Sequence, residues 1–186
     1  MTMGTISDWR LPMHPSYLYT VPLFHCNGWG HAWTMTALAG KIVCCRQVSA
    51  MAIYDAINTQ KVTHLGGAPI ILGMIINAES SDRKEFSHTV EIMTAGAPPP
   101  AAILEGIEKL GFKVMHVYGL TETYGHAVMC FWQDQWDDTD FTQRAIIKAR
   151  QGVAMTATES TRVVDLNTRE DVPKDCKTIG EIVLQG

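Results

Sequence analysis

Short apolar runs alternate with amphipathic segments along most of the chain. The apolar runs are rich in β-branched and aromatic residues and are typical of buried strands. They lie at 17–24, 41–46, 62–67, 90–96 and 113–118, and the run at 62–67 is expected to end in a turn at Gly66 and Gly67. The segments at 31–40, 50–60, 69–78 and 101–110 instead read as helices, most of them with apolar residues recurring every three or four positions. Strands and helices in this order predict βαβ units, and therefore an α/β fold with a mostly parallel sheet flanked by helices.

Capping residues predict where several of these helices begin and end. Ser49 precedes 50–60 and has the side chain of an N-cap, while Pro69 suits the first position of its helix. Gly111 is expected to end the helix at 101–110. The residues before Tyr17 are expected to form a loose start, and 25–30 a turn.

The pattern changes beyond Gly125. Trp132 and Trp136 are four residues apart and are expected to pack together, and the aspartates around them to form a solvated edge; an acidic metal site is the alternative. A short helix is expected at 141–152, followed by two strands joined by a turn as an antiparallel hairpin. We therefore divide the chain into a central α/β subdomain, 1–150, and the start of a β-rich subdomain, 151–186.

Composition narrows the class of protein. With 46% hydrophobic and 18% charged residues among 186, the chain is expected to be globular, and its net charge of −4 argues against nucleic acid as a partner. The longest apolar run, 68–76, is too short to span a bilayer, and no signal peptide is visible. Five scattered cysteines are expected to be reduced thiols in a cytoplasmic protein, because their spacing does not match a zinc site.

The sequence HVYGLTETYG, from His116 to Gly125, combines a strand with groups that suit a nucleotide. Gly119 is expected to end the strand. Thr121 can donate to a phosphate oxygen, Glu122 can bind a hard cation such as Mg²⁺, and the ring of Tyr118 can stack on a base. The alternative is that Thr121 and Glu122 only cap a following helix.

Three such segments follow predicted strands: 22–30, 95–100 and 118–122. Parallel strands place their carboxyl ends along one edge of the sheet, so the three are expected to meet at one pocket. Gly96, Ala97 and Pro98 lack bulky side chains and would let the backbone approach a flat ligand. Other nucleotide and hydrolase signatures are missing: there is no G-x-S-x-G turn and no G-x-x-x-x-G-K-[ST] loop.

Four segments together resemble successive motifs of the adenylate-forming, AMP-binding acyl-CoA synthetase family. They are VPLFHCNGWG, MTAGAPPP, VYGLTETYG and VVDLNTREDVP with TIGEIVLQG. Their order and spacing match, and the resemblance covers almost the whole chain. It is strongest toward fatty-acid and short- or medium-chain acyl-CoA ligases.

The resemblance implies an acid–thiol ligase. A carboxylic acid attacks the α-phosphate of ATP to give an acyl-adenylate and pyrophosphate, and CoA then displaces AMP to form a thioester. Tyr118 and Gly119 would lie beside adenine, together with Gly96, Ala97 and Pro98. Thr121 would bond the phosphate and Glu122 would hold Mg²⁺. His25 would lie between the acyl pocket and the phosphates, and Trp29, Gly66 and Gly67 would line the acyl or CoA channel; core packing is the alternative for His25 and Trp29.

The resemblance also implies parts that residues 1–186 lack. The family's phosphate-gripping loop would precede Met1, and its ribose-binding aspartate and catalytic lysine would follow Gly186. We therefore expect the middle of a ligase that is inactive alone. The alternatives are a stand-alone module that binds AMP or an acyl-adenylate without turnover, and a truncated product that folds without function. Uncovered sheet edges would favour a homo-oligomer.

Overall fold

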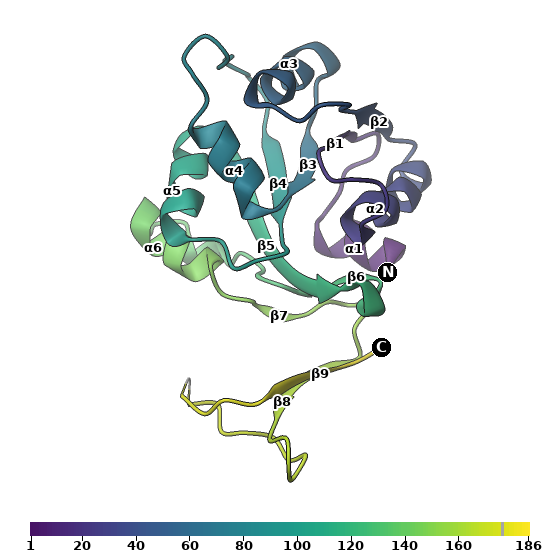
Figure 1. Ribbon diagram of the computed structural model, residues 1–186, viewed down its shortest axis with the longest axis vertical. Helices are drawn as coiled ribbons and strands as arrows, with labels where there is room; N and C mark the ends of the chain where they lie inside the picture. The colour runs from purple at the N-terminus through teal and green to yellow at the C-terminus, as the bar shows by residue number, and fades with distance from the viewer. Residues whose placement is uncertain (176) are drawn as a thin grey trace.

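A central sheet is covered by helices on both faces (Figure 1). The computed structural model describes residues 1–175 and 177–186, and for Asn27 and Trp29 it describes the backbone only. The helices are α1 (Thr2–Asp8), α2 (Cys26–Ala37), α3 (Ala50–Gln60), α4 (Pro69–Ile76), α5 (Ala101–Lys109) and α6 (Phe141–Lys148), with short 3₁₀ turns η1 (Thr121–Thr123) and η2 (Asp134–Trp136). The strands are β1 (Ser16–Tyr19), β2 (Lys41–Cys44), β3 (His64–Gly67), β4 (Val90–Thr94), β5 (Phe112–Leu120), β6 (Gly125–Met129), β7 (Val153–Ala154), β8 (Ser160–Val164) and β9 (Glu181–Gln185).

The main sheet has the order β2-β1-β3-β4-β5-β6-β7. Strands β1 to β5 pair in parallel, whereas β6 and β7 join the β5 edge as antiparallel strands. The predicted α/β class with a mostly parallel sheet is therefore confirmed. Parallel strands need a crossover between them, and α2, α3, α4 and α5 supply these connections.

Helix boundaries follow the capping residues. The Ser49 hydroxyl accepts a 3.1 Å hydrogen bond from the backbone N–H of Ala52, and Pro69 is the first residue of α4. Gly111 follows α5 with φ +90°, a conformation that L side chains rarely adopt. These three predictions are confirmed.

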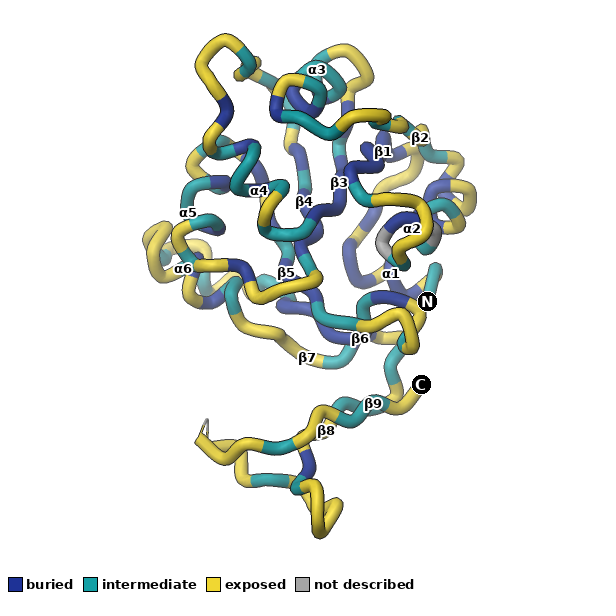
Figure 2. Tube along the Cα trace, viewed as in Figure 1, coloured by how far each residue is buried: buried dark blue, intermediate teal, exposed yellow. Residues whose placement is uncertain are grey.

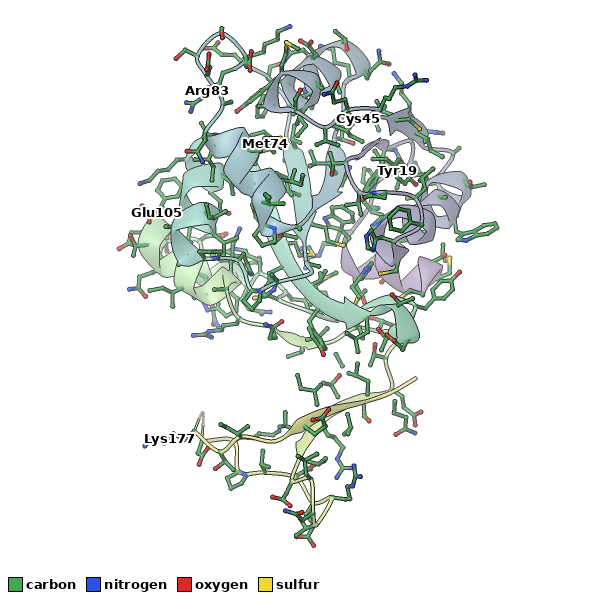
Figure 3. The ribbon with its side chains drawn as sticks, in the orientation of Figure 1. Tyr19, Cys45, Met74, Arg83, Glu105 and Lys177 are labelled. Carbon is green, nitrogen blue, oxygen red and sulfur yellow. The ribbon has the colours of Figure 1, made fainter. Side chains whose placement is uncertain are left out.

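Two hydrophobic cores lie on opposite faces of the sheet. Helices α3 to α6 cover the face that holds Leu18, Ile92 and Val114, while α1 and α2 cover the face that holds Tyr17 and Met93. Because successive side chains of a strand point to opposite faces of the sheet, β1, β4 and β5 each contribute residues to both cores. Figure 2 shows the buried residues gathered in the central strands, and Figure 3 shows Tyr19 and Met74 on the two sides of the sheet.

The expected loose start is wrong, because residues 2–8 form α1. Its last residue, Asp8, is buried, and its carboxylate accepts bonds from Thr156 N at 2.9 Å and from Thr156 Oγ1 at 2.6 Å. A hydrogen bond to a charged group is stronger than one between neutral groups. Contacts that are distant in the sequence therefore hold this helix in place.

The expected strand at 17–24 and turn at 25–30 are also corrected. Strand β1 ends at Tyr19, and α2 already begins at Cys26. A Cβ on Gly28 would overlap Pro22 O and lie 2.7 Å from Leu23 Cα. Gly28 therefore serves close packing between the first turn of the helix and the preceding loop, whereas its sequence context was typical of a turn.

The C-terminal hairpin is confirmed, although its connection is much longer than a turn. Strands β8 and β9 pair as antiparallel strands and extend away from the main sheet (Figure 1). Val153 and Ala154 pair with β6, so the chain leaves the main sheet only after residue 154. The boundary between subdomains at residue 150 stays a prediction. Trp132 and Trp136 pack edge to face, with 5.4 Å between ring centroids, as expected.

We predict that Gly28→Ala destabilises the chain by about 1–3 kcal/mol, because the methyl group overpacks against residues 22 and 23. Gly30 is a matched control in the same helix, since a Cβ there would meet nothing within 4 Å. Gly30→Ala should leave stability unchanged or raise it by up to about 1 kcal/mol. Urea denaturation of both variants measures the difference; equal stabilities would contradict this account of Gly28.

Candidate functional site

Strands β4 and β5 end at the same edge of the sheet. They are parallel neighbours, with Thr94 paired to His116, so the residues that follow Thr94 lie beside those that follow His116. The Gly96 turn, with φ +89°, is thereby placed next to Tyr118 and Gly119. The prediction that these turns share one rim is confirmed.

A cavity of about 230 Å³ opens at this rim. Its walls bring together His25, Gly96 and Gly119, three of the residues singled out from the sequence. The complete lining is Val21, His25, Cys26, Ala68, Met93, Ala95, Gly96, Val117, Gly119, Gly125 and His126. This lining therefore includes residues from all three segments that follow predicted strands, 22–30, 95–100 and 118–122.

The turn after β5 differs from the expectation. The strand continues through Gly119 to Leu120, passes the 3₁₀ turn Thr121–Thr123, and returns as β6. Thr123 Oγ1 accepts a 2.9 Å bond from Leu120 N and lies 2.7 Å from Gly125 O, which closes the turn. No α-helix follows. Thr121 and Glu122 begin a single 3₁₀ turn whose capping bond is accepted by Thr123, so the structure does not show them capping a longer helix.

Gly119 has a steric role instead of ending the strand. A Cβ at this position would lie 2.6 Å from both Gly125 C and His126 Cα. The register of β5 against β6 also shifts between Tyr118 and Gly119. A glycine allows the two strands to approach, and the residues that follow the irregularity, Leu120, Thr121 and Glu122, are exposed.

Thr121 and Glu122 are exposed, and Tyr118 is half-buried. Neither Thr121 nor Glu122 lines the 230 Å³ cavity; Glu122 instead lines a wider hollow of about 740 Å³ with Thr2, Ala157 and Leu184. Both side chains are therefore accessible to a ligand that lies over the outside of the turn. Their assigned roles stay predictions.

The donor set suits a metal held mainly by a ligand's phosphates. The described residues contain no group of three or more His, Cys, Asp or Glu side chains that could bind a metal by themselves. Mg²⁺ commonly uses one or two carboxylates and completes its shell with phosphates and water. The single exposed carboxylate of Glu122 fits that mode. The exposed backbone at Gly96, where a Cβ would meet nothing within 4 Å, likewise leaves room for a flat ring.

The remaining predicted residues divide into two groups. His25 is exposed at the N-cap position of α2 and lines the cavity. Gly66 and Gly67 are buried within β3, so the expected turn there is wrong: both pair with β4, and a Cβ on Gly67 would lie 2.9 Å from Ile71 Cβ. The residue after them, Ala68, is the one that lines the cavity. The side chain of Trp29 lies outside the described residues.

Thiols in the described part of the chain are free, as expected. Cys26, Cys44, Cys45 and Cys130 form no disulfide, and Cys26 lines the cavity. Cys176 lies outside the described residues.

The sequence interpretation missed Met93, Val117 and His126 as cavity residues. Alternation along β4 and β5 places Met93 and Val117 on the face that carries the cavity, and this signal was present in the sequence. His126 had no such signal, because strand β6 was not predicted.

His126 belongs to a cluster of histidines among aromatic rings. Its Nε2 lies 3.0 Å from Thr5 Oγ1, and its ring stacks with that of buried His31 at 5.9 Å between centroids. His64, also buried, lies edge-on to Trp9 at 5.1 Å. Burial lowers the pKa of His126 to about 3 and that of His64 to about 4, and His31 lowers both further. Both imidazoles are therefore neutral near pH 7.

Comparison with known proteins places these features in one family. The family described as AMP-binding enzyme matches residues 1–186. A 2-methylpropanoate–CoA ligase of Humulus lupulus is 46% identical over 186 residues, and a peroxisomal acetate/butyrate–CoA ligase of Arabidopsis thaliana is 44% identical over 187. Both alignments cover 100% of this chain and 33% of the relative, so the chain spans about a third of their length.

Solved structures share the fold at lower identity. A long-chain-fatty-acid–CoA ligase of Archaeoglobus fulgidus has a TM-score of 0.80 at 19% identity, with 100% of this chain and 37% of that chain covered. An o-succinylbenzoate coenzyme A synthetase of Bacillus subtilis in complex with AMP has a TM-score of 0.76 at 19% identity, with 100% and 35% covered. No helix among the described residues has the length and apolarity to cross a membrane.

Buried His64 and half-buried His126 predict a loss of stability in mild acid. The unfolded chain takes up protons below about pH 6.5, whereas folded His64 and His126 stay neutral down to about pH 4 and 3. The free energy of unfolding should therefore be level above pH 7 and fall between about pH 6.5 and 4, by roughly 1 kcal/mol per pH unit for each histidine.

Urea denaturation from pH 8 to pH 4 checks this dependence. His64→Gln, which removes one titrating group, should reduce the slope below pH 6.5 by about one proton and leave the level region at high pH. Equal slopes in the parent and the variant would contradict the assignment to His64.

Proposed function

Since the chain belongs to the family of AMP-binding enzymes, we propose that it forms part of the AMP-binding domain of an ATP-dependent acid–CoA ligase. The observation that carries this proposal is the shared rim, where His25, Gly96 and Gly119 line one cavity and Thr121 and Glu122 lie just beyond it. The ligase names of the relatives support it. Because the chain spans about a third of those relatives, the complete reaction is proposed for the whole protein in which it occurs.

The proposed nucleotide lies on the outer side of the rim. The exposed backbone of Gly96, Ala97 and Pro98 would face one side of adenine, and the half-buried ring of Tyr118 would stack beside it. The Thr121 hydroxyl would donate to a phosphate oxygen. Glu122 would hold Mg²⁺, which when bound neutralises charge that develops on the phosphoryl oxygens.

The proposed acid occupies the 230 Å³ cavity, with its carboxylate toward Gly96 and Gly119. His25 lies at the cavity wall and is exposed, so its ring would be placed between the acid and the phosphates. The carboxylate oxygen attacks the α-phosphate and pyrophosphate leaves; the thiol of CoA then attacks the acyl carbon and AMP leaves. The residues of this chain orient the two reactants, which is a large part of catalysis in a two-substrate reaction.

We further propose that residues 1–186 alone do not catalyse formation of acyl-CoA. The relatives are about three times as long, and the phosphate-gripping loop and catalytic lysine implied by the resemblance have no counterpart within the chain. A cytoplasmic location stays a prediction, and one relative carries a peroxisomal name. Self-association through sheet edges also stays a prediction.

Neutralising Glu122 tests the nucleotide site. In the protein translated from the complete reading frame, Glu122→Gln should weaken Mg²⁺-dependent ATP binding by about 10- to 100-fold, because a charge-assisted contact is lost. Isothermal calorimetry with and without Mg²⁺ measures this effect. Glu85→Gln, at an exposed carboxylate on the 79–88 loop, is the matched control. Unchanged Mg²⁺-dependent affinity in Glu122→Gln would remove Glu122 from the site.

The purified 186-residue chain tests the proposed lack of turnover. We expect no acyl-CoA from acid, ATP and CoA, and AMP binding in the millimolar range or weaker. Formation of acyl-CoA would refute the proposal. Tight AMP binding without turnover would instead favour a module that binds AMP or an acyl-adenylate.

A further inference from the structure

Buried Met93 and Val117 form the floor of the 230 Å³ cavity, and we propose that they restrict the acid that binds there to a short aliphatic chain. This inference rests on the proposed function and adds to it the class of acid and the residues that select it. It follows from what forms the floor of the cavity, what lines its walls and how much space remains.

The floor consists of side chains that cannot move aside at low cost. Met93 and Val117 line the cavity and are only 1% and 2% exposed. Both belong to the core beneath α1 and α2, where they pack with Tyr19, Met35 and Met129. Protein interiors are packed about as densely as organic crystals, so a longer acyl chain would have to displace core residues.

The walls are suited to a hydrocarbon chain. Val21, Ala68 and Ala95 are apolar, and none of the described lining residues is Lys, Arg, Asp or Glu. A second carboxylate at the far end of the acid would find no cation there, and burying an unpaired charge is costly. The cavity therefore disfavours dicarboxylic acids.

One wall is fixed by polar contacts instead of apolar packing. His126 lines the cavity, its Nε2 contacts Thr5 Oγ1, and its ring stacks on buried His31. Cys26 lies beside Gly125 on the same side, 4.0 Å from the position that a Cβ on Gly125 would take. This wall is thus held by α1 and α2 and is expected to stay in place when an acid binds.

The available space sets an upper limit on the acid. A volume of about 230 Å³ is below the roughly 300–1,000 Å³ typical of sites for drug-sized ligands. At about 30 Å³ for each water-sized group, the cavity holds on the order of eight such groups. Acetate, butyrate, 2-methylpropanoate and hexanoate meet this limit, whereas decanoate exceeds it. Segments outside residues 1–186 can narrow or cover the opening, but they cannot remove a floor that this chain supplies.

Pyrophosphate release measured with a series of acids tests the inference in the protein translated from the complete reading frame. The parent should be most active with acetate, butyrate, 2-methylpropanoate or hexanoate, judged by kcat/KM. Val117→Ala and Met93→Ala should each raise the ratio of octanoate to butyrate activity by about tenfold or more, because a methylene in an apolar pocket changes kcat/KM by about 10- to 200-fold. Val117→Ile should have the opposite effect and reduce hexanoate activity most.

Val114→Ala is the matched control. Val114 lies on the same strand and is also buried, but it faces the opposite core, so its truncation lowers stability without enlarging the cavity. Its acid preference should equal that of the parent. If Val117→Ala fails to fold, the acid preferences of Met93→Ala and Val117→Ile test the proposed restriction instead.

The two proposals fail in different ways. If no acid supports pyrophosphate release by the parent, the proposed ligase function is wrong. If release occurs but the parent prefers decanoate, or if Val117→Ala and Met93→Ala keep the parent's preference, the ligase function stands and the restriction by Met93 and Val117 is wrong.

Discussion

The parallel pairing of β4 with β5 is the constraint on which the rest of the site depends. With Thr94 opposite His116, both strands end at the same rim, and the Gly96 turn must lie beside Tyr118 and Gly119. The same pairing places Met93 and Val117 on one face below the rim, where they form the floor of the cavity. A shift of one residue in this register would exchange the faces of all these side chains.

The β5–β6 hairpin adds the second constraint, because it decides which groups point over the rim. Gly119 allows β5 to approach Gly125 and His126 closely, and the 3₁₀ turn between the two strands leaves Thr121 and Glu122 exposed. The hairpin also carries His126 back to the cavity wall, against α1 and α2. One local fold thus supplies groups to the outer and the inner part of the site.

The sequence predicted features that depend on local chemistry. The cap at Ser49, Pro69 at the start of α4 and Gly111 after α5 each act within a few residues, and each prediction is confirmed. The alternation of strands and helices was equally local, and it was sufficient for the α/β class. The shared rim followed from the general rule for parallel strands together with these elements.

The errors occurred where distant contacts decide the structure. Helix α1 depends on the contact of Asp8 with Thr156, and Gly28 on its approach to residues 22 and 23. Gly66, Gly67 and Gly119 have the sequence contexts of turns, although packing of neighbouring elements requires at least Gly67 and Gly119. Since β6 returns from a turn that resembled the start of a helix, His126 was not found as a cavity residue.

Amide NMR of the 15N-labelled 186-residue chain during an AMP titration tests the central claim most directly, since the method detects binding even in the millimolar range. If the Gly96 turn and the β5–β6 turn share one nucleotide, the amides of Gly96, Gly119 and Thr121 will shift together with a single dissociation constant, while that of Gly111 at the opposite edge stays in place. Shifts confined to one of the two turns, or different dissociation constants for them, would contradict a common nucleotide site.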